Sequence, residues 1–329
     1  MGIESVLQTA SRADYSFKNI PVIDVEGLES EDLVVRQQLA RDIRNACINI
    51  GFFYVKNHGI PEKSSFGAVN AGKKFFALPE EIKQKYNLRK SPNYTGYTAN
   101  FDENNDPAGR GDLHEAFDVG PDKSYSHKQS EIPANPWPNT EVPEFKDCAL
   151  SFYNAAAEFG KKLFPIFALA LGVPENFFDD KTKEDAIVMR VIRYPPQTGP
   201  HDDRVIGIGA HSDFEVFTLL WQEPGIESLQ VMDANKEWIN ATPIPGTLVV
   251  NVGDQLSRCA NDVFKSTVHR AVNRSGVERH SMPVFFNFDY NVKLEAIPSC
   301  VSAEHPPKYE VITAGEYVKS RMDTIYNYK

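Results

Sequence analysis

Residues 210–222 read AHSDFEVFTLLWQ, and this stretch decides what the middle of the chain can form. It places a His-x-Asp pair, His211 and Asp213, directly before a run of apolar and β-branched residues that is typical of a strand. Alternate residues of a strand project from the same face, so the two side chains can reach one ion. His269, in KSTVHRAV at residues 265–272, can supply a third ligand from a neighbouring strand.

Two histidines and one carboxylate on one face of a metal ion leave three coordination positions open, which suits Fe(II) oxygen chemistry. The same ligand types also suit catalytic zinc. A second His-x-Asp pair, His201 and Asp203, lies in PPQTGPHDDR, a loop-forming stretch without alternating apolar residues. We assign the metal to His211, Asp213 and His269, because a strand holds ligands more rigidly than such a loop.

A candidate anion site lies further along the same region. The segment ERHSMPVFFNFDY places Arg279 and Ser281 on one face of another strand. Arginine offers a planar, bidentate clamp for a carboxylate, and the serine hydroxyl adds a donor. Arg279 lies far enough beyond His269 for the chain to turn and run back beside it, and Tyr194 in MRVIRYPP is a further donor. The pattern predicts an anion pocket next to the metal.

Composition excludes several function classes. The 329 residues include 45 acidic and 35 basic side chains, a formal net charge of −10. This balance disfavours nucleic acid and anionic membranes, because both reward a local excess of Lys and Arg. The longest apolar run, LFPIFALALGV, is too short to span a bilayer, and the four dispersed cysteines form no C-x-x-C pair. Without a basic and apolar leader, we expect a cytoplasmic protein that binds a small molecule and has no obligate protein partner.

The spacing of apolar residues changes along the chain. It predicts helices over residues 33–50, 64–77 and 143–171. Residues 186–290 instead form short β-branched or aromatic runs between Gly/Pro turns, which favours a sandwich or jelly roll over a parallel sheet. The predicted fold class is α+β with a mainly β core: a double-stranded β-helix (jelly roll) with N-terminal helical additions and a long supporting helix.

We expect a single catalytic domain, 1–329, with three parts. They are an N-terminal region that contains a lid loop (15–145), the jelly-roll core (185–292) and a C-terminal segment (293–329). The lid is expected within residues 87–112, which are rich in Asn, Gly and Asp.

The motifs resemble those of the Fe(II)/2-oxoglutarate-dependent dioxygenases, in the branch that includes isopenicillin N synthase. The resemblance extends to IPVIDV, GFFYVKNHGIP and KKFFALPEEIK in the N-terminal half and to the tail TAGEYVKSRM. It implies a jelly roll that binds Fe(II) through three ligands: His211, Asp213 and His269. It also implies that the distal carboxylate of 2-oxoglutarate is held by three donors: Tyr194, Arg279 and Ser281.

The resemblance implies an oxidoreductase that uses O₂ and 2-oxoglutarate to oxidise a C–H bond, by hydroxylation or with rearrangement such as ring expansion, and releases succinate and CO₂. Three alternatives stay open. An isopenicillin N synthase-type oxidase would not use 2-oxoglutarate. A zinc hydrolase would leave Arg279 and Ser281 without a role, and the chain lacks H-E-x-x-H. A non-catalytic jelly-roll binding protein would tolerate loss of a ligand, yet all three are present.

Strand alternation also suggests what the pocket accepts. If Tyr194 points inward, Arg190 does too, and it either binds substrate or pairs with a buried acid such as Glu115 or Asp118. A free Arg190 would favour a small oxygenated substrate, aromatic or polyketide-like, as in secondary metabolism. The apolar wall is expected to come from strand and loop residues: Phe214, Phe217, Leu220, Phe285, Tyr97 and Phe101.

Overall fold

The computed structural model describes residues 16–105, 110–121, 134–197 and 205–326. Its strands form two sheets. The larger sheet has the order β1-β2-β10-β7-β12-β5-β4-β3, in which only the β1–β2 pair is parallel. Its strands have these bounds: β1 Val22–Asp24, β2 Phe52–Lys56, β3 Gly96–Thr98, β4 Glu115–Val119, β5 Ile187–Tyr194, β7 Phe217–Gln222, β10 Thr247–Val252 and β12 Arg279–Phe286.

The smaller sheet has the order β6-β11-β8-β9. Its strands are β6 Ile208–His211, β8 Leu229–Met232, β9 Trp238–Asn240 and β11 His269–Ala271. From β5 to β12 the chain passes repeatedly between the sheets, since β5, β7, β10 and β12 lie in the larger one and β6, β8 and β11 in the smaller. This alternation is the topology of a double-stranded β-helix, so the predicted fold class is confirmed.

Helices lie mainly in the N-terminal half and at the C-terminal end of the described chain. Their bounds are α2 Leu33–Asn49, α3 Glu62–Phe76, α4 Glu80–Lys83, α5 Phe145–Ala170, α6 Asp254–Cys259 and α7 Ala314–Tyr326. Short 3₁₀ turns add η1 Glu26–Glu29, η2 Gln84–Tyr86, η3 Leu88–Lys90, η4 Glu175–Phe178 and η5 Pro298–Cys300. The three helices expected from apolar spacing are present, with ends shifted by one or two residues.

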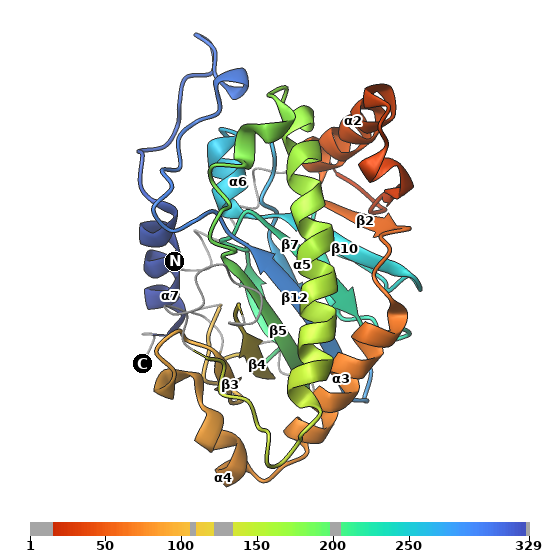
Figure 1. Ribbon diagram of the computed structural model, residues 1–329, viewed down its shortest axis with the longest axis vertical. Coiled ribbons are helices and arrows are strands. Elements are labelled where there is room, and N and C mark those ends of the chain that lie inside the picture. Colours follow the sequence, from red (N-terminus) through yellow and green to blue (C-terminus); the bar gives the residue numbers. More distant parts are fainter. Residues whose placement is uncertain (1–15, 106–109, 122–133, 198–204, 327–329) are drawn as a thin grey trace.

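The long helix α5 covers one face of the larger sheet (Figure 1). Under it, the rings of Phe217 on β7 and Phe286 on β12 stack with centroids 4.5 Å apart. Phe164 and Phe167 of α5 pack against Phe217, each at 5.1 Å. Burying such rings contributes about 1.5–3 kcal/mol each, so this contact fixes α5 on the sheet.

The opposite, inner face of the same strands is less covered. Along β5, Ile187 and Met189 are buried, whereas Val188 and Arg190 between them are only partly buried. Because alternate residues point to opposite faces, the first half of β5 is packed more closely toward the helices than toward the smaller sheet, whereas Ile192 and Tyr194 near its end are buried on the inner face.

The N-terminal region contributes strands as well as helices. β1 and β2 extend the larger sheet at one edge, and β3 and β4 extend it at the other. β3 and its bridge from Asn87 to Tyr97 lie in the segment expected to be a lid, so the described part of that segment is tied to the sheet.

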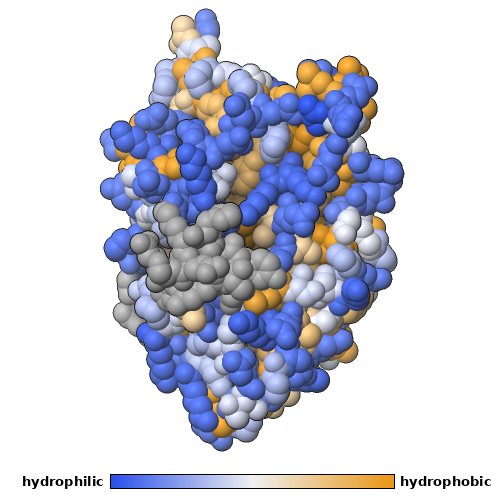
Figure 2. Space-filling model, in the orientation of Figure 1, coloured by the Kyte–Doolittle hydropathy of each residue, from blue (hydrophilic) through white to orange (hydrophobic). Residues whose placement is uncertain are grey.

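Hydrophilic side chains dominate the face of the molecule that carries α5, and apolar side chains gather near α2 (Figure 2). None of the helices in the described ranges is long and apolar enough to cross a membrane.

A glycine on α5 provides a test of the helix–sheet contact. A Cβ added at Gly160 would lie 2.0 Å from the Phe286 ring. We expect Gly160→Ala to lower the free energy of unfolding by about 1–3 kcal/mol, the usual cost of overpacking, although alanine is the better helix former. Urea unfolding would measure the change, with the exposed Ser151→Ala on the same helix as control. A Gly160→Ala protein more stable than the parent would contradict this packing.

Candidate active site

Two neighbouring strands of the smaller sheet bring the metal-ligand candidates together. His211 at the end of β6 is the direct register partner of His269 at the start of β11. Asp213 follows β6 by two residues, and its Oδ1 lies 3.5 Å from the Nε2 atom of each histidine. One potential ligand atom from each residue lies within 4.8 Å of the others. The three side chains therefore converge on one point that a metal ion fits.

Hydrogen bonds hold each of the three groups in a ligating orientation. The Nδ1–H of His211 donates to the Gly209 carbonyl at 2.8 Å, and that of His269 donates to the Thr267 carbonyl at 3.1 Å. This tautomer leaves both Nε2 lone pairs facing Asp213, and such partners are typical of metal-binding histidines. The arrangement therefore suits an ion without any change in tautomer.

The Asp213 carboxylate is fixed from its other side. Its Oδ2 accepts hydrogen bonds from Thr218 Oγ1 at 2.5 Å and Asn251 Nδ2 at 2.7 Å. Burial disfavours its charged form, but the His269 and His211 side chains, when protonated, outweigh burial and hold the pKa of the Asp213 carboxyl well below its usual value. A charged carboxylate is thus ready to ligate a cation.

The His211–Asp213 pair does not lie within one strand, contrary to the sequence-based prediction. His211 ends a strand and Asp213 lies on the irregular link to β7, so the pair is not held by strand alternation. Thr218 and Asn251 supply the rigidity instead. Asn251 had a detectable signal, because it is a lone polar residue inside the apolar strand TLVVNV. The alternative pair, His201 and Asp203, lies outside the described residues.

Arg279 stands at the start of β12, inside the larger sheet. It is 1% exposed, and its Nε and Nη1 atoms have no hydrogen-bond partner among the described residues. Its Nη2 donates to Gln222 Oε1 at 3.2 Å, and its guanidinium lies 4.7 Å from the centre of the Tyr194 ring. Burial lowers the pKa of the Arg279 guanidinium. A buried cation with open donors is costly unless an anion binds it.

Strand pairing places the other two predicted donors beside Arg279. Tyr194 is the register partner of Arg279, and Ser281 Oγ donates to the Tyr194 hydroxyl at 3.4 Å. One expectation was wrong: β12 does not run back beside the His269 strand, because β11 belongs to the smaller sheet and β12 to the larger. The metal candidates and the anion donors thus come from different sheets of the jelly roll.

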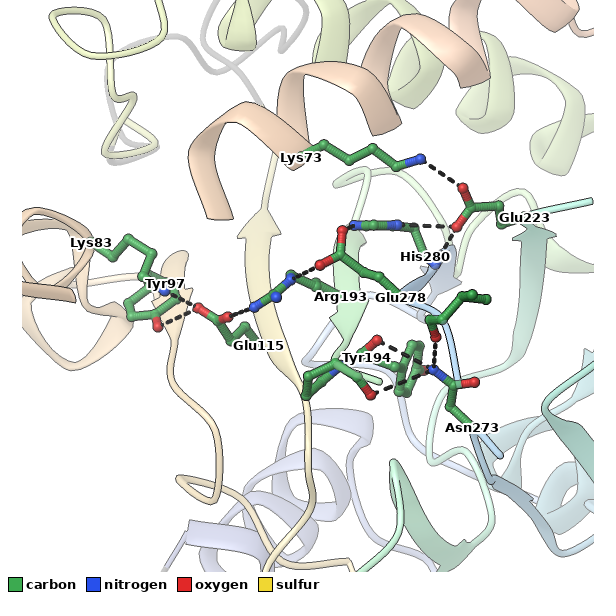
Figure 3. Close-up of polar contacts among 12 residues, drawn as sticks. Lys73, Lys83, Tyr97, Glu115, Arg193, Tyr194, Glu223, Asn273, Glu278 and His280 are labelled. Atoms are coloured by element: carbon green, nitrogen blue, oxygen red, sulfur yellow. Dashed lines mark hydrogen bonds and ion pairs between the residues drawn. The ribbon is translucent and has the colours of Figure 1, made fainter. Parts of the chain in front are cut away.

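A chain of charged contacts passes through Arg193 and His280 (Figure 3), which alternate with the donors along β5 and β12 and therefore face outward. His280 bonds Glu223 through both its backbone N–H at 2.7 Å and its ring Nδ1 at 3.1 Å. The contacts continue in both directions through Lys73–Glu223, Arg193–Glu278, Arg193–Glu115 and Lys83–Glu115. Arg193 and His280 are the outward neighbours of Tyr194 and Arg279, so the chain ties together the strands that carry the donors.

The structure separates the predicted wall residues into two groups. Phe214, Leu220 and Phe285 are partly buried, and Leu220 and Phe285 alternate with residues that pack under α5. Phe217 belongs to the packed face under α5, not to the interior. Phe101 is 41% exposed on its loop.

Tyr97 is also a core residue. It is fully buried, its ring contacts Phe75 of α3 at 5.8 Å, and its hydroxyl donates to Glu115 at 2.7 Å. It packs at the β3 edge of the larger sheet, so we withdraw it from the substrate wall.

Arg190 is paired with buried acids. Its guanidinium donates to both oxygens of Asp118, at 2.7 and 2.9 Å, and to both oxygens of Glu103, at 2.8 and 2.7 Å. Of the two acids considered from sequence, Asp118 is correct, whereas Glu115 binds Lys83 and Arg193 instead. Glu103 was missed because it lies in an irregular segment, where no periodicity indicates direction. Arg190 is therefore committed to protein carboxylates.

Glu215 is a second residue that sequence reasoning missed. It is 6% exposed, and its Oε2 atom has no partner within the described part of the chain. Burial and, after it, the nearby Asp213 carboxylate raise the pKa of Glu215 well above its usual range.

Comparison with known proteins identifies the family. The chain matches the 2OG-Fe(II) oxygenase superfamily model over residues 184–288, and the model for the N-terminal part of the non-haem dioxygenase in morphine synthesis over residues 20–140. A 2-oxoglutarate-Fe(II) type oxidoreductase of Metarhizium majus is 32% identical, covering 98% of this chain and 91% of its own length. The chain belongs to the 2OG-Fe(II) oxygenase superfamily.

Two other relatives cover the chain almost fully. Homoarginine-6-hydroxylase of Oryza sativa subsp. japonica is 34% identical, over 94% of this chain and 98% of the relative. The crystal structure of a full-length Neurospora crassa protein in complex with alpha-KG and thymine superposes with a TM-score of 0.81 at 29% identity, over 93% of this chain and 97% of that one.

The superfamily settles the chemistry in general terms. The chain is an oxidoreductase of the dioxygenase type that depends on Fe(II), 2-oxoglutarate and O₂. The donor set agrees with this assignment, because two imidazoles and a carboxylate suit Fe(II) and an open, buried guanidinium suits a carboxylate.

The hydrogen bond from Asn251 to Asp213 predicts an effect on metal affinity. We expect Asn251→Ala to weaken Fe(II) binding about 10–100-fold, the usual cost of removing a hydrogen bond to a metal ligand. Anaerobic Fe(II) titration would measure it, with the exposed Asn240→Ala as the matched control. Unchanged affinity in Asn251→Ala would show that Asp213 needs no such support.

Proposed function

We propose that this oxygenase oxidises a C–H bond of a small organic molecule and releases succinate and CO₂. His211, Asp213 and His269 would hold Fe(II), which supplies O₂ activation and redox chemistry when bound. The observation that carries the proposal is Arg279, a fully buried guanidinium whose Nε and Nη1 atoms have no partner within the described ranges.

The chain's own residues would position the cosubstrate. Arg279 would bind the distal carboxylate of 2-oxoglutarate with two donors, and Ser281 and Tyr194 would add hydroxyl groups from the same two strands. Fixing that end would orient the keto-acid end toward the metal ligands, which is catalysis by orientation. Gln222, already bonded to Arg279, keeps the guanidinium in place.

This arrangement favours 2-oxoglutarate use over the alternatives. A zinc hydrolase or a non-catalytic binding protein gives Arg279 and Ser281 no defined role, and without an anion the burial of Arg279 would cost stability. An oxidase that takes all its electrons from substrate could place a substrate carboxylate on Arg279, and the dependence of turnover on 2-oxoglutarate distinguishes it.

The ion pairs of Arg190 change the prediction of the substrate class. The interpretation as an oxygenated aromatic or polyketide-type metabolite required a free Arg190, and this side chain instead holds Asp118 and Glu103. That substrate class, ring expansion and a role in secondary metabolism stay predictions without support from Arg190. Phe214, Leu220 and Phe285 support a substrate with an apolar carbon skeleton. The rice relative is named for homoarginine and the Neurospora structure contains thymine, so nitrogen-bearing molecules are associated with the relatives.

The test of this function is cosubstrate binding. Anaerobic Fe(II) protein plus 2-oxoglutarate should develop a weak visible charge-transfer band. We expect Arg279→Gln to raise the dissociation constant for 2-oxoglutarate by roughly tenfold or more, because a charged hydrogen bond contributes about 1.5–3 kcal/mol. The exposed Arg89→Gln serves as control. A normal dissociation constant in Arg279→Gln, or turnover that needs no 2-oxoglutarate, would refute the proposal.

A further inference from the structure

We propose that the carboxyl group of Glu215 binds a nitrogen hydrogen-bond donor of the substrate: an amine, a guanidine or a ring N–H. This inference rests on the proposed function, because it concerns the substrate of the same interior site. Glu215 would determine substrate specificity by contacting the substrate and not the cosubstrate.

Among the residues that the structure describes, Glu215 Oε2 is the one buried carboxylate oxygen without a hydrogen-bond partner. Glu103 and Glu115 are equally buried, at 3% and 1% exposure, and each contacts a basic side chain. Glu215 is 6% exposed, yet its Oε2 has no partner among the described residues. Buried polar atoms in folded proteins nearly always have one. A ligand group that donates to this oxygen would remove the cost of its burial.

The chain holds Glu215 firmly next to the metal candidates. It follows Asp213 by two residues, and its carbonyl accepts a hydrogen bond from the Gln255 N–H at 3.0 Å. Gly253 packs so closely that an added Cβ would lie 2.2 Å from that carbonyl oxygen. A backbone held in this way gives the side chain a defined direction.

The charged groups that act on the Glu215 carboxyl are Asp213, which is a metal-ligand candidate, Asp254 and Arg190. Arg190 lies on the inner, partly uncovered face of β5. Phe214 and Phe285, also partly buried, provide an apolar surface in the same region of the fold.

The charges around the interior favour a donor over an acceptor. Arg190 is already used by Glu103 and Asp118, and His114 lies 3.4 Å from Glu103. A substrate carboxylate or phosphate placed at Glu215 would also meet the Asp213 and Asp254 carboxylates, and the Arg190 cation is already bound by Glu103 and Asp118. An amine or a guanidine offers several N–H donors and a ring N–H offers one. A protonated amine or guanidine would also favour the charged form of the Glu215 carboxyl and make a charge-assisted bond to it.

Matched pairs of compounds test this inference. The pairs are benzylamine with benzyl alcohol, n-butylguanidine with n-pentanol, and indole with benzofuran. For each compound we would measure 2-oxoglutarate-dependent succinate formation and the change in the anaerobic charge-transfer band. The enzymes would be the wild type, Glu215→Gln and the exposed Glu31→Gln. We expect the wild type and Glu31→Gln to prefer a nitrogen member by roughly tenfold or more. Glu215→Gln should lose that preference through a higher KM, with its dissociation constant for 2-oxoglutarate unchanged.

The outcomes separate this inference from the proposed function. Failure of the wild type to bind 2-oxoglutarate would refute the function itself. Three results would each overturn the role of Glu215 while 2-oxoglutarate still gives the normal band. They are no response to any nitrogen compound, equal use of the oxygen compounds, and an unchanged preference in Glu215→Gln. Glu215→Asp, which keeps the carboxyl group but shortens its reach, should lie between the wild type and Glu215→Gln.

Discussion

The stacking of Phe217 on Phe286 under α5 is the contact on which the site depends. These rings fix the outward faces of β7 and β12, and strand alternation then determines what the inward faces carry. On β7 the inward residues include Thr218, which bonds Asp213, and Gln222, which bonds Arg279. One strand of the larger sheet thus supports both the metal candidates of the smaller sheet and the anion donors.

Electrostatics divides the interior into two kinds of surface. Arg279 offers open donors to a small anion, whereas Glu215 offers an open acceptor. Most other buried charges are matched within the protein, as in the Arg190 contacts with Asp118 and Glu103. The net charge of −10 therefore says little about the ligands. Arg279 and Glu215 would instead define which part of the interior binds the cosubstrate and which binds the substrate.

The sequence predicted which residues form the site better than it predicted their contacts. The His211, Asp213 and His269 cluster followed from residue types, and the Tyr194–Arg279 pairing agrees with alternation on adjacent strands. Alternation placed Arg190 inward but could not show its partners, because Glu103 comes from an irregular segment far along the chain. Tyr97 and Phe217 were assigned to the wall since aromatic residues look alike in a pattern; only tertiary packing shows that they are core. Strand membership in one sheet or the other, which separates β11 from β12, depends on crossovers that local spacing does not encode.

The most direct measurement is an anaerobic crystal structure of the protein with Fe(II) and 2-oxoglutarate. The central claim is that one chamber between the two sheets binds metal and cosubstrate together. It predicts iron coordinated by His211, Asp213 and His269, with the distal carboxylate of 2-oxoglutarate on Arg279 and Ser281. Iron at other residues, or a keto-acid whose distal carboxylate lies away from Arg279, would contradict it.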